Sequence, residues 1–270
     1  ENLQVWVGPR IENYYMLASA PSIYKPVTKQ FALGGNGSAY GSSTSPGFGA
    51  AWTQQVDDPS DARFAVSANY SAKSGNSSAV NKGLFGDDTE SFFLTKVEYG
   101  SPQWQVSIAT AWKDGWDNDG YYQSALATAS PNVAANSDMT AYALRAYWKP
   151  EETGALPEVQ LGYDWAEIDG AASGQAEETE GWMVGLGWKD LLMDGNRAGF
   201  AIGSAQSATK VKGGGSDPEA DNTRWEAYYT FKVNDGVSVT PAIFGATDVT
   251  NASGTVTDVD GAVLLTEFRF

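Results

Sequence analysis

Apolar and polar residues alternate along most of the chain with the two-residue period of a β-strand. In the stretch 103–113, Trp104, Ile108 and Trp112 fall on one face and Lys113 falls on the other. The lengths of such stretches are close to the roughly ten residues that a tilted strand needs to cross a bilayer. The pattern predicts no convincing helix and about twelve strands, at 2–7, 47–55, 62–72, 91–99, 103–113, 139–149, 157–167, 181–189, 197–206, 224–233, 237–247 and 261–270.

Basic residues within the predicted strands keep to the polar face. A basic residue on a lipid-facing stripe costs about 2–4 kcal/mol at the bilayer midplane, and none interrupts an apolar stripe here. The solvated face of a soluble sheet would hold such residues as well. Small residues such as Gly162 and Gly185 share the polar face and predict a wide, water-filled lumen instead of a packed interior. The expected channel-lining residues are Arg63, Lys96, Glu98, Lys113, Arg145, Lys149, Asp164, Arg197, Arg224, Glu226, Lys232, Glu267 and Arg269.

The connections between the predicted strands alternate between short and long. Outer-membrane barrels pair short periplasmic turns with long extracellular loops, whereas a soluble sandwich has no reason to alternate in this way. The pattern therefore predicts that all the long connections start and end at the extracellular end of a barrel. These connections are 8–46, 73–90, 114–138, 168–180, 207–223 and 248–260.

Composition narrows the chemistry that the chain can perform. The 270 residues include no cysteine and no histidine, and the net charge is −16. Nucleophiles, general bases and metal ligands of the thiolate and imidazole type are therefore absent. Catalysis by a pair of carboxylates remains possible. We nevertheless expect no enzyme activity, no cofactor and no metal site. The acidic charge argues against nucleic acid as a partner. No run of about 18 apolar residues exists that would form a membrane-spanning helix.

The longest connection, 8–46, is a second candidate site. Structureless loops of this length are usually functional or disordered, and the aromatic and apolar content of this one argues against disorder. The loop could fold into the lumen and narrow it, which would set the size limit and the charge preference of a channel. An external loop packed on neighbouring loops or on a trimer partner remains open. The candidate constriction residues are Arg10, Glu12, Tyr14, Tyr15, Tyr24 and Lys25.

Both ends of the chain resemble one family. Residues 6–10 read Trp-Val-Gly-Pro-Arg, and Glu-Asn-x-x-Met-Leu-Ala and Pro-Ser-x-Tyr follow at 12–18 and 21–24. With Ser-Val-Thr-Pro-Ala-Ile-Phe at 238–244 and a final strand ending on Phe270, the chain resembles the cyanobacterial outer-membrane porins of the OprB-like, or iron-uptake porin, family. The resemblance implies a homotrimeric β-barrel in the outer membrane of a Gram-negative, cyanobacterial cell. It also implies an upstream S-layer-homology domain and further strands, so the chain could be the later part of a roughly sixteen-stranded barrel.

The expected fold is therefore all-β, a transmembrane antiparallel up-and-down β-barrel that spans residues 1–270. The expected function is passive diffusion of small hydrophilic solutes or inorganic ions, with outer-membrane lipid, solutes and sister protomers as partners. Iron, other ions and sugars remain open as solutes. Basic channel walls would favour anions, whereas acidic loops would concentrate cations. The alternative is a soluble, cell-surface β-sandwich that binds glycans through its tryptophan and tyrosine residues.

Overall fold

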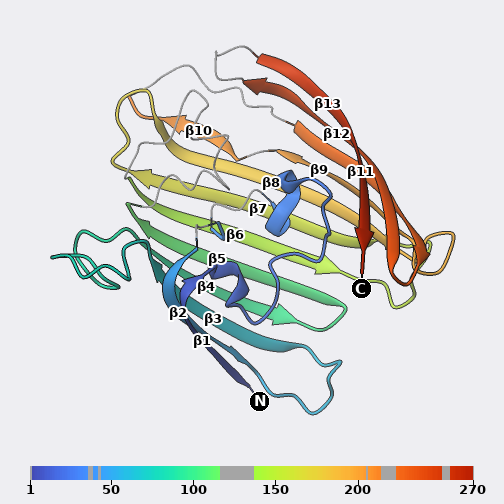
Figure 1. Ribbon diagram of the computed structural model, residues 1–270, viewed down its shortest axis with the longest axis horizontal. Helices are drawn as coiled ribbons and strands as arrows, with labels where there is room; N and C mark the ends of the chain where they lie inside the picture. The colour runs from blue at the N-terminus through green and yellow to red at the C-terminus, as the bar shows by residue number, and fades with distance from the viewer. Residues whose placement is uncertain are drawn as a thin grey trace.

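The computed structural model describes residues 2–35, 39–41, 44–115, 137–204, 206–213, 223–250 and 256–269. In this part of the chain, thirteen strands form a single antiparallel sheet (Figure 1), which confirms the all-β prediction. One sheet, not two packed sheets, rules out the sandwich architecture for the described strands. The strands are β1 Leu3–Ile11, β2 Ser45–Thr53, β3 Arg63–Ala72, β4 Ser91–Gly100, β5 Trp104–Asp114, β6 Asp138–Trp148, β7 Glu158–Asp169, β8 Ala176–Lys189, β9 Arg197–Ser204, β10 Ser207–Val211, β11 Thr223–Asn234, β12 Val237–Thr250 and β13 Val256–Phe268.

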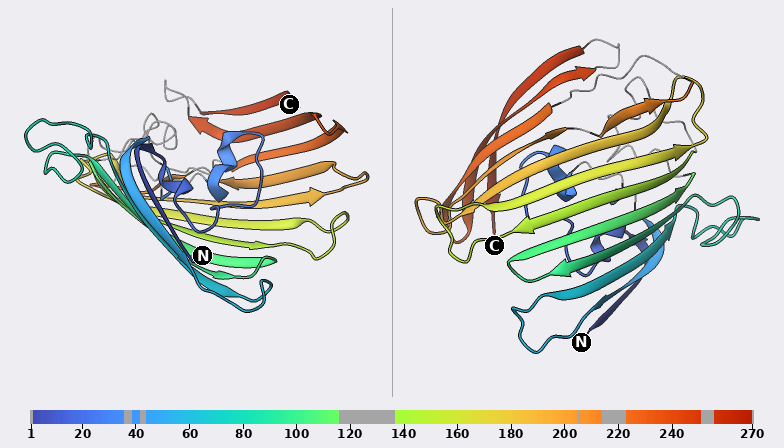
Figure 2. Two further views of the ribbon diagram at one scale, coloured as in Figure 1. Left: turned by 60° about the horizontal axis from the view of Figure 1, so that its bottom comes forward. Right: turned by 180° about the vertical axis from the view of Figure 1, so that it is seen from behind.

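The sheet is an up-and-down meander. Each strand from β1 to β8 pairs with the next, and the path continues from β9 to β11, β12 and β13. The sheet curves into a trough with β1 and β13 at its opposite edges (Figure 2). Among the described residues no pairing joins these two edge strands.

All twelve predicted strands are present, but two of the predicted long connections are largely strand. The hairpin of β12 and β13 extends to the pair Thr250–Val256, and β8 begins at Ala176, inside the predicted connection 168–180. The short strand β10, which the pattern did not predict, pairs with this extension of β8. Lysine and glutamate residues on facing strands stabilise the extension, since Lys210 Nζ lies 2.8 Å from Glu178 Oε1. Outside a continuous apolar stripe, the period-two signal is too weak to reveal such strands.

The two faces of the sheet have inverted polarity relative to a soluble protein. In β4, Phe93, Val97 and Tyr99 have 37–44% of their surface exposed, whereas Lys96 is 1% and Glu98 is 5% exposed. The same contrast runs across the neighbouring strands, whose apolar residues stand on the convex face. Apolar side chains normally occupy the protected side of a soluble sheet. Here the protected side carries charged residues as well as buried apolar ones.

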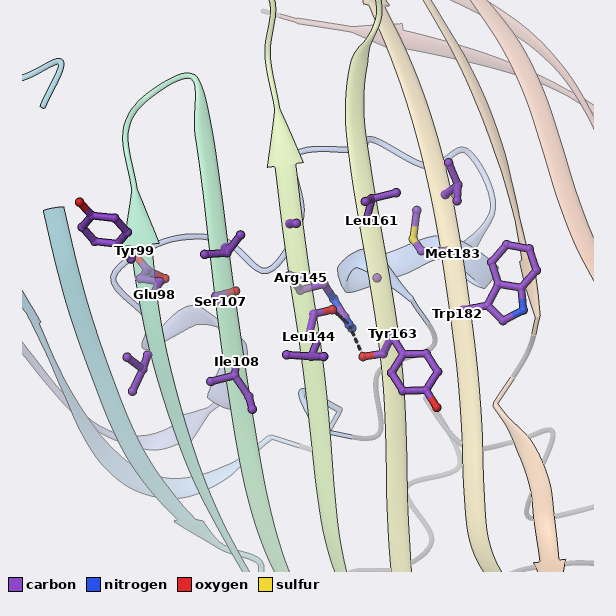
Figure 3. Close-up of a pocket in the computed structure, with 15 residues that line it drawn as sticks. Glu98, Tyr99, Ser107, Ile108, Leu144, Arg145, Leu161, Tyr163, Trp182 and Met183 are labelled. Atoms are coloured by element: carbon purple, nitrogen blue, oxygen red, sulfur yellow. Dashed lines mark hydrogen bonds between the residues drawn. The ribbon is translucent and has the colours of Figure 1, made fainter. Parts of the chain in front are cut away.

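Aromatic residues border the apolar face in two rows. Beside the short turns this face carries Tyr99, Trp104, Trp148 and Trp188, and farther from these turns it carries Phe93, Trp112, Tyr142, Trp165 and Trp182. Rings on adjacent strands touch, as Phe93 and Trp112 do with centroids 5.6 Å apart. Between the rows lies an aliphatic band with a shallow hollow of about 640 Å³. Figure 3 shows Ile108, Leu144 and Leu161 at this hollow.

A segment comprising residues 12–35 and 39–41, named the inner segment from here on, lies in the trough against the concave face (Figure 2). It contains two short 3-10 helices, η1 Asn13–Tyr15 and η2 Lys29–Gly34. Its described apolar residues Leu17 and Tyr40 join a buried cluster with Phe92 and Leu94 of β4 and Met139 of β6. The main hydrophobic core therefore lies between the inner segment and the sheet.

The small residues of the concave face do not leave open space where the inner segment crosses them. A Cβ atom on Gly162 would collide with the carbonyl oxygen of Gly34, and one on Gly185 would come within 2.9 Å of the Tyr24 ring. The expectation that these glycines line a wide lumen is therefore wrong at both positions. They lack side chains because the backbone and rings of the inner segment occupy that volume.

Candidate functional site

The concave face and the inner segment form the candidate site. The first contact between them joins Ser19 to an ion pair on β4. The Lys96 ammonium lies 2.5 Å from the carboxylate of Glu98, two residues along the same face of β4. Lys96 Nζ donates to the carbonyl oxygen of Ser19 at 3.1 Å and to its hydroxyl at 2.8 Å. The Ser19 hydroxyl donates in turn to Glu98 Oε2 at 2.8 Å. The ion pair and one turn of the inner segment therefore hold each other in place.

A second contact joins the inner segment to β6 and β7. Arg145 Nη2 donates to Asp164 Oδ1 at 2.8 Å, and the two side chains are 3% and 1% exposed. Arg145 Nε donates to the Leu33 carbonyl at 2.9 Å, and the Tyr40 ring packs over the guanidinium with 5.4 Å between Cζ and the ring centroid. The planar guanidinium thus serves an ion pair and a backbone carbonyl at once.

The third contact is made by Glu226 of β11, which is fully buried. Its carboxylate accepts hydrogen bonds from the Tyr24 hydroxyl at 2.9 Å, the Val27 amide at 3.1 Å, and the Thr28 amide at 2.9 Å and hydroxyl at 2.5 Å. Hydrogen bonds to an ionised acceptor are stronger than neutral ones. Burial, and next the charge of Glu226, raise the pKa of Tyr24 well above its usual value, so its hydroxyl stays a donor.

Uncharged residues that the sequence did not single out complete the docking. Asn69 Nδ2 donates to the carbonyl oxygens of Asn13 and Met16 at 3.0 and 3.2 Å. Gln160 Oε1 accepts from the Ile23 amide at 2.9 Å. Their only signal in the sequence is a large polar side chain on the polar face of a predicted strand, which many solvated residues share.

The predicted channel-lining residues divide into three groups. The first is buried beneath the inner segment and comprises Lys96, Glu98, Lys113, Arg145, Asp164 and Glu226. The second keeps at least part of its surface exposed and comprises Arg63, Lys149, Arg197, Lys232, Glu267 and Arg269. Arg224 is partly buried and has a partner in the structure. Only some of the predicted channel-lining residues therefore have side chains that are exposed in the structure.

The predicted constriction residues also differ in position. Tyr24 is buried against Glu226, and Tyr14 packs on the main hydrophobic cluster. Tyr15 and Lys25 are exposed, and Glu12 immediately precedes η1. Arg10 belongs to β1, whose ladder continues to Ile11, so its assignment to the long connection is wrong.

Open space on the concave face lies beside the short turns. One cavity of about 350 Å³ is lined by Lys25 of the inner segment and by strand-end residues that include Lys149 and Arg197. A second cavity of about 420 Å³ shares Lys25 and Arg197 with the first and extends toward β12 and β13. Both cavities have a mixed lining that is much more polar than that of the hollow on the convex face.

Within the described residues no cluster of three or more acidic side chains could hold a metal ion. No described helix has the length and apolar character needed to cross a membrane. The chain matches no known family model and no curated protein.

Proposed function

We propose that this chain forms the wall of a water-filled channel in the outer membrane of a Gram-negative cell, through which small hydrophilic solutes or inorganic ions diffuse passively. The inverted polarity of the sheet carries this proposal. The convex face exposes an aliphatic band between two rows of aromatic rings, and the concave face holds the charged residues. A bilayer covers such a band, and aromatic side chains favour its two interfaces.

The inner segment supports a constriction within that channel. It is anchored to charged groups on β4, β6, β7 and β11, so its position is fixed by several independent contacts. A segment held in this way leaves a narrower path than the trough alone. In the proposed channel it sets the size limit, while the exposed basic residues set the charge preference.

A channel also requires that the edges β1 and β13 be closed. An unpaired edge in hydrocarbon would leave backbone N–H and C=O groups unsatisfied, at several kcal/mol each. In the proposal the edges pair with each other or with further strands, and the closed barrel associates as a homotrimer.

Planar-bilayer recording of the detergent-purified protein tests this function. We expect stepwise conductance increases of ion-channel size and slower gel mobility after heating, because a closed barrel migrates faster than its unfolded chain. A protein that stays in solution without detergent and produces no conductance steps would contradict the proposal. Binding to a glycan array under those conditions would favour the soluble glycan-binding alternative.

A further inference from the structure

The two cavities beside the short turns carry a concentration of positive charge that the chain as a whole does not have. They open between residues 20–27 of the inner segment and the adjacent strand ends. Their basic lining residues are Lys25, Lys149, Lys189, Arg197, Lys232 and Arg269. The complete chain, by contrast, has a net charge of −16. This local excess of cations therefore runs against the overall composition.

Each acidic residue that lines the cavities is already matched by one of these cations. Glu158 lies 2.5 Å from Lys189, Asp235 lies 2.7 Å from Lys232, and Glu267 lies 3.1 Å from Arg269, measured between charged atoms. Three lining cations remain, and among the described residues they form no ion pair with an acidic side chain. These are Lys25, Lys149 and Arg197.

The three unmatched cations come from different elements and meet at one cavity. Lys25 belongs to the inner segment, Lys149 follows the last residue of β6, and Arg197 is the first residue of β9. Lys149 Nζ lies 4.9 Å from the centroid of the Tyr147 ring, and Tyr228 also lines the cavity. The volume of about 350 Å³ lies at the lower end of the range for small-molecule sites.

We propose that this cavity is a binding site for small inorganic oxyanions of the phosphate type and makes the channel selective for anions. The proposal rests on the proposed function and names its solute class. A group of unmatched cations lining a channel raises the local concentration of anions and repels cations. Arg197 offers the forked donors that suit an oxyanion, and the two lysines add point charges.

Reversal potentials in a potassium chloride gradient test the selectivity, in bilayers of neutral lipid so that no lipid headgroup supplies the charge. The variant combines Lys25→Gln, Lys149→Gln and Arg197→Gln. A matched control combines Lys73→Gln, Lys210→Gln and Lys212→Gln, which remove three cations that are paired with acids away from the cavities. We expect wild type and control to favour chloride, and the triple variant to lose roughly threefold or more in the chloride-to-potassium permeability ratio. A cation-selective wild type, or an unchanged ratio in the triple variant, would overturn the proposal.

Inorganic phosphate provides a second readout that does not need conductance. Binding to the folded state raises its unfolding temperature, so phosphate is expected to stabilise the detergent-solubilised wild type more than chloride does at equal ionic strength. Arg197→Lys, which keeps the charge but loses the forked donors, should retain part of this shift, and the triple variant should lose it. Phosphate stabilisation without any conductance would leave the oxyanion site standing and refute the channel. Equal shifts in wild type and triple variant would refute the site.

Discussion

The Tyr24 hydroxyl donates a 2.9 Å hydrogen bond to the carboxylate of Glu226, although 202 residues separate the two in the chain. The contact links the inner segment to β11, near one edge of the sheet. Three further hydrogen bonds from Val27 and Thr28 converge on the same carboxylate. This carboxylate therefore fixes the position of the inner segment across the trough.

Glu226→Gln is expected to loosen this contact. The amide of glutamine keeps one acceptor but presents an N–H₂ group to donors from Thr28, so at least one buried donor loses its partner. We expect a cost of about 1.5–3 kcal/mol in the free energy of docking and a larger single-channel conductance. The control is Glu178→Gln, which removes an exposed carboxylate of β8. Unchanged conductance in Glu226→Gln would show that the inner segment does not limit the path.

Arg145 and Asp164 are expected to depend on each other. Arg145→Met leaves the Asp164 carboxylate buried without its cation, which costs about 3–5 kcal/mol in the free energy of unfolding. The double variant with Asp164→Leu removes both charges and should recover most of that loss. Urea unfolding followed by gel mobility measures all four proteins of the cycle. Additive losses in the double variant would contradict a coupled pair.

Gly162 and Gly187 provide a matched pair of substitutions on adjacent strands. A Cβ atom at Gly162 collides with the Gly34 carbonyl, whereas one at Gly187 has no neighbour within 4 Å. We expect Gly162→Ala to displace the inner segment, with faster proteolysis of residues 12–41 and altered conductance. Gly187→Ala should leave both unchanged. If the two variants behave alike, the inner segment does not dock at Gly162.

Leu144→Lys tests which medium covers the convex face. Leu144 is 43% exposed within the aliphatic band. In a bilayer this substitution costs about 2–4 kcal/mol near the midplane, so the fraction of folded, heat-modifiable protein should fall. Leu144→Val is the conservative control. In water an exposed lysine is easily tolerated, so undiminished membrane insertion of Leu144→Lys would argue against a lipid-facing surface.

The raised pKa of Tyr24 predicts that the folded protein loses stability at alkaline pH. Its folded-state pKa is raised, first by burial and then by Glu226, above the value of about 10 that an unfolded chain has. The unfolded state therefore releases this proton first as pH rises, so the stabilisation is complete below about pH 10 and is lost above it. Chemical unfolding across this range should show a steeper decline for wild type than for Tyr24→Phe. Parallel curves would mean that Tyr24 ionises normally when folded.

The sequence by itself determined the strands and their two faces. Alternation in stretches such as 103–113 placed Trp104 and Ile108 opposite Lys113, and the structure keeps them on opposite faces of β5. Neighbouring strands of a meander pair across short distances along the chain, so local periodicity and turn positions carry most of the necessary information. The signal failed only where strands run on beyond the apolar stripe, as in β8 and β10.

Only the tertiary structure decided where the inner segment lies and what the concave residues contact. The Arg145 contact to Leu33 spans 112 positions and the Ser19 contact to Glu98 spans 79, and no local pattern encodes such separations. Tertiary packing likewise turned Gly162 from an expected lumen residue into the place where Gly34 fits. A period-two pattern reports which face a side chain occupies. What covers that face depends on contacts between parts of the chain that lie far apart in the sequence.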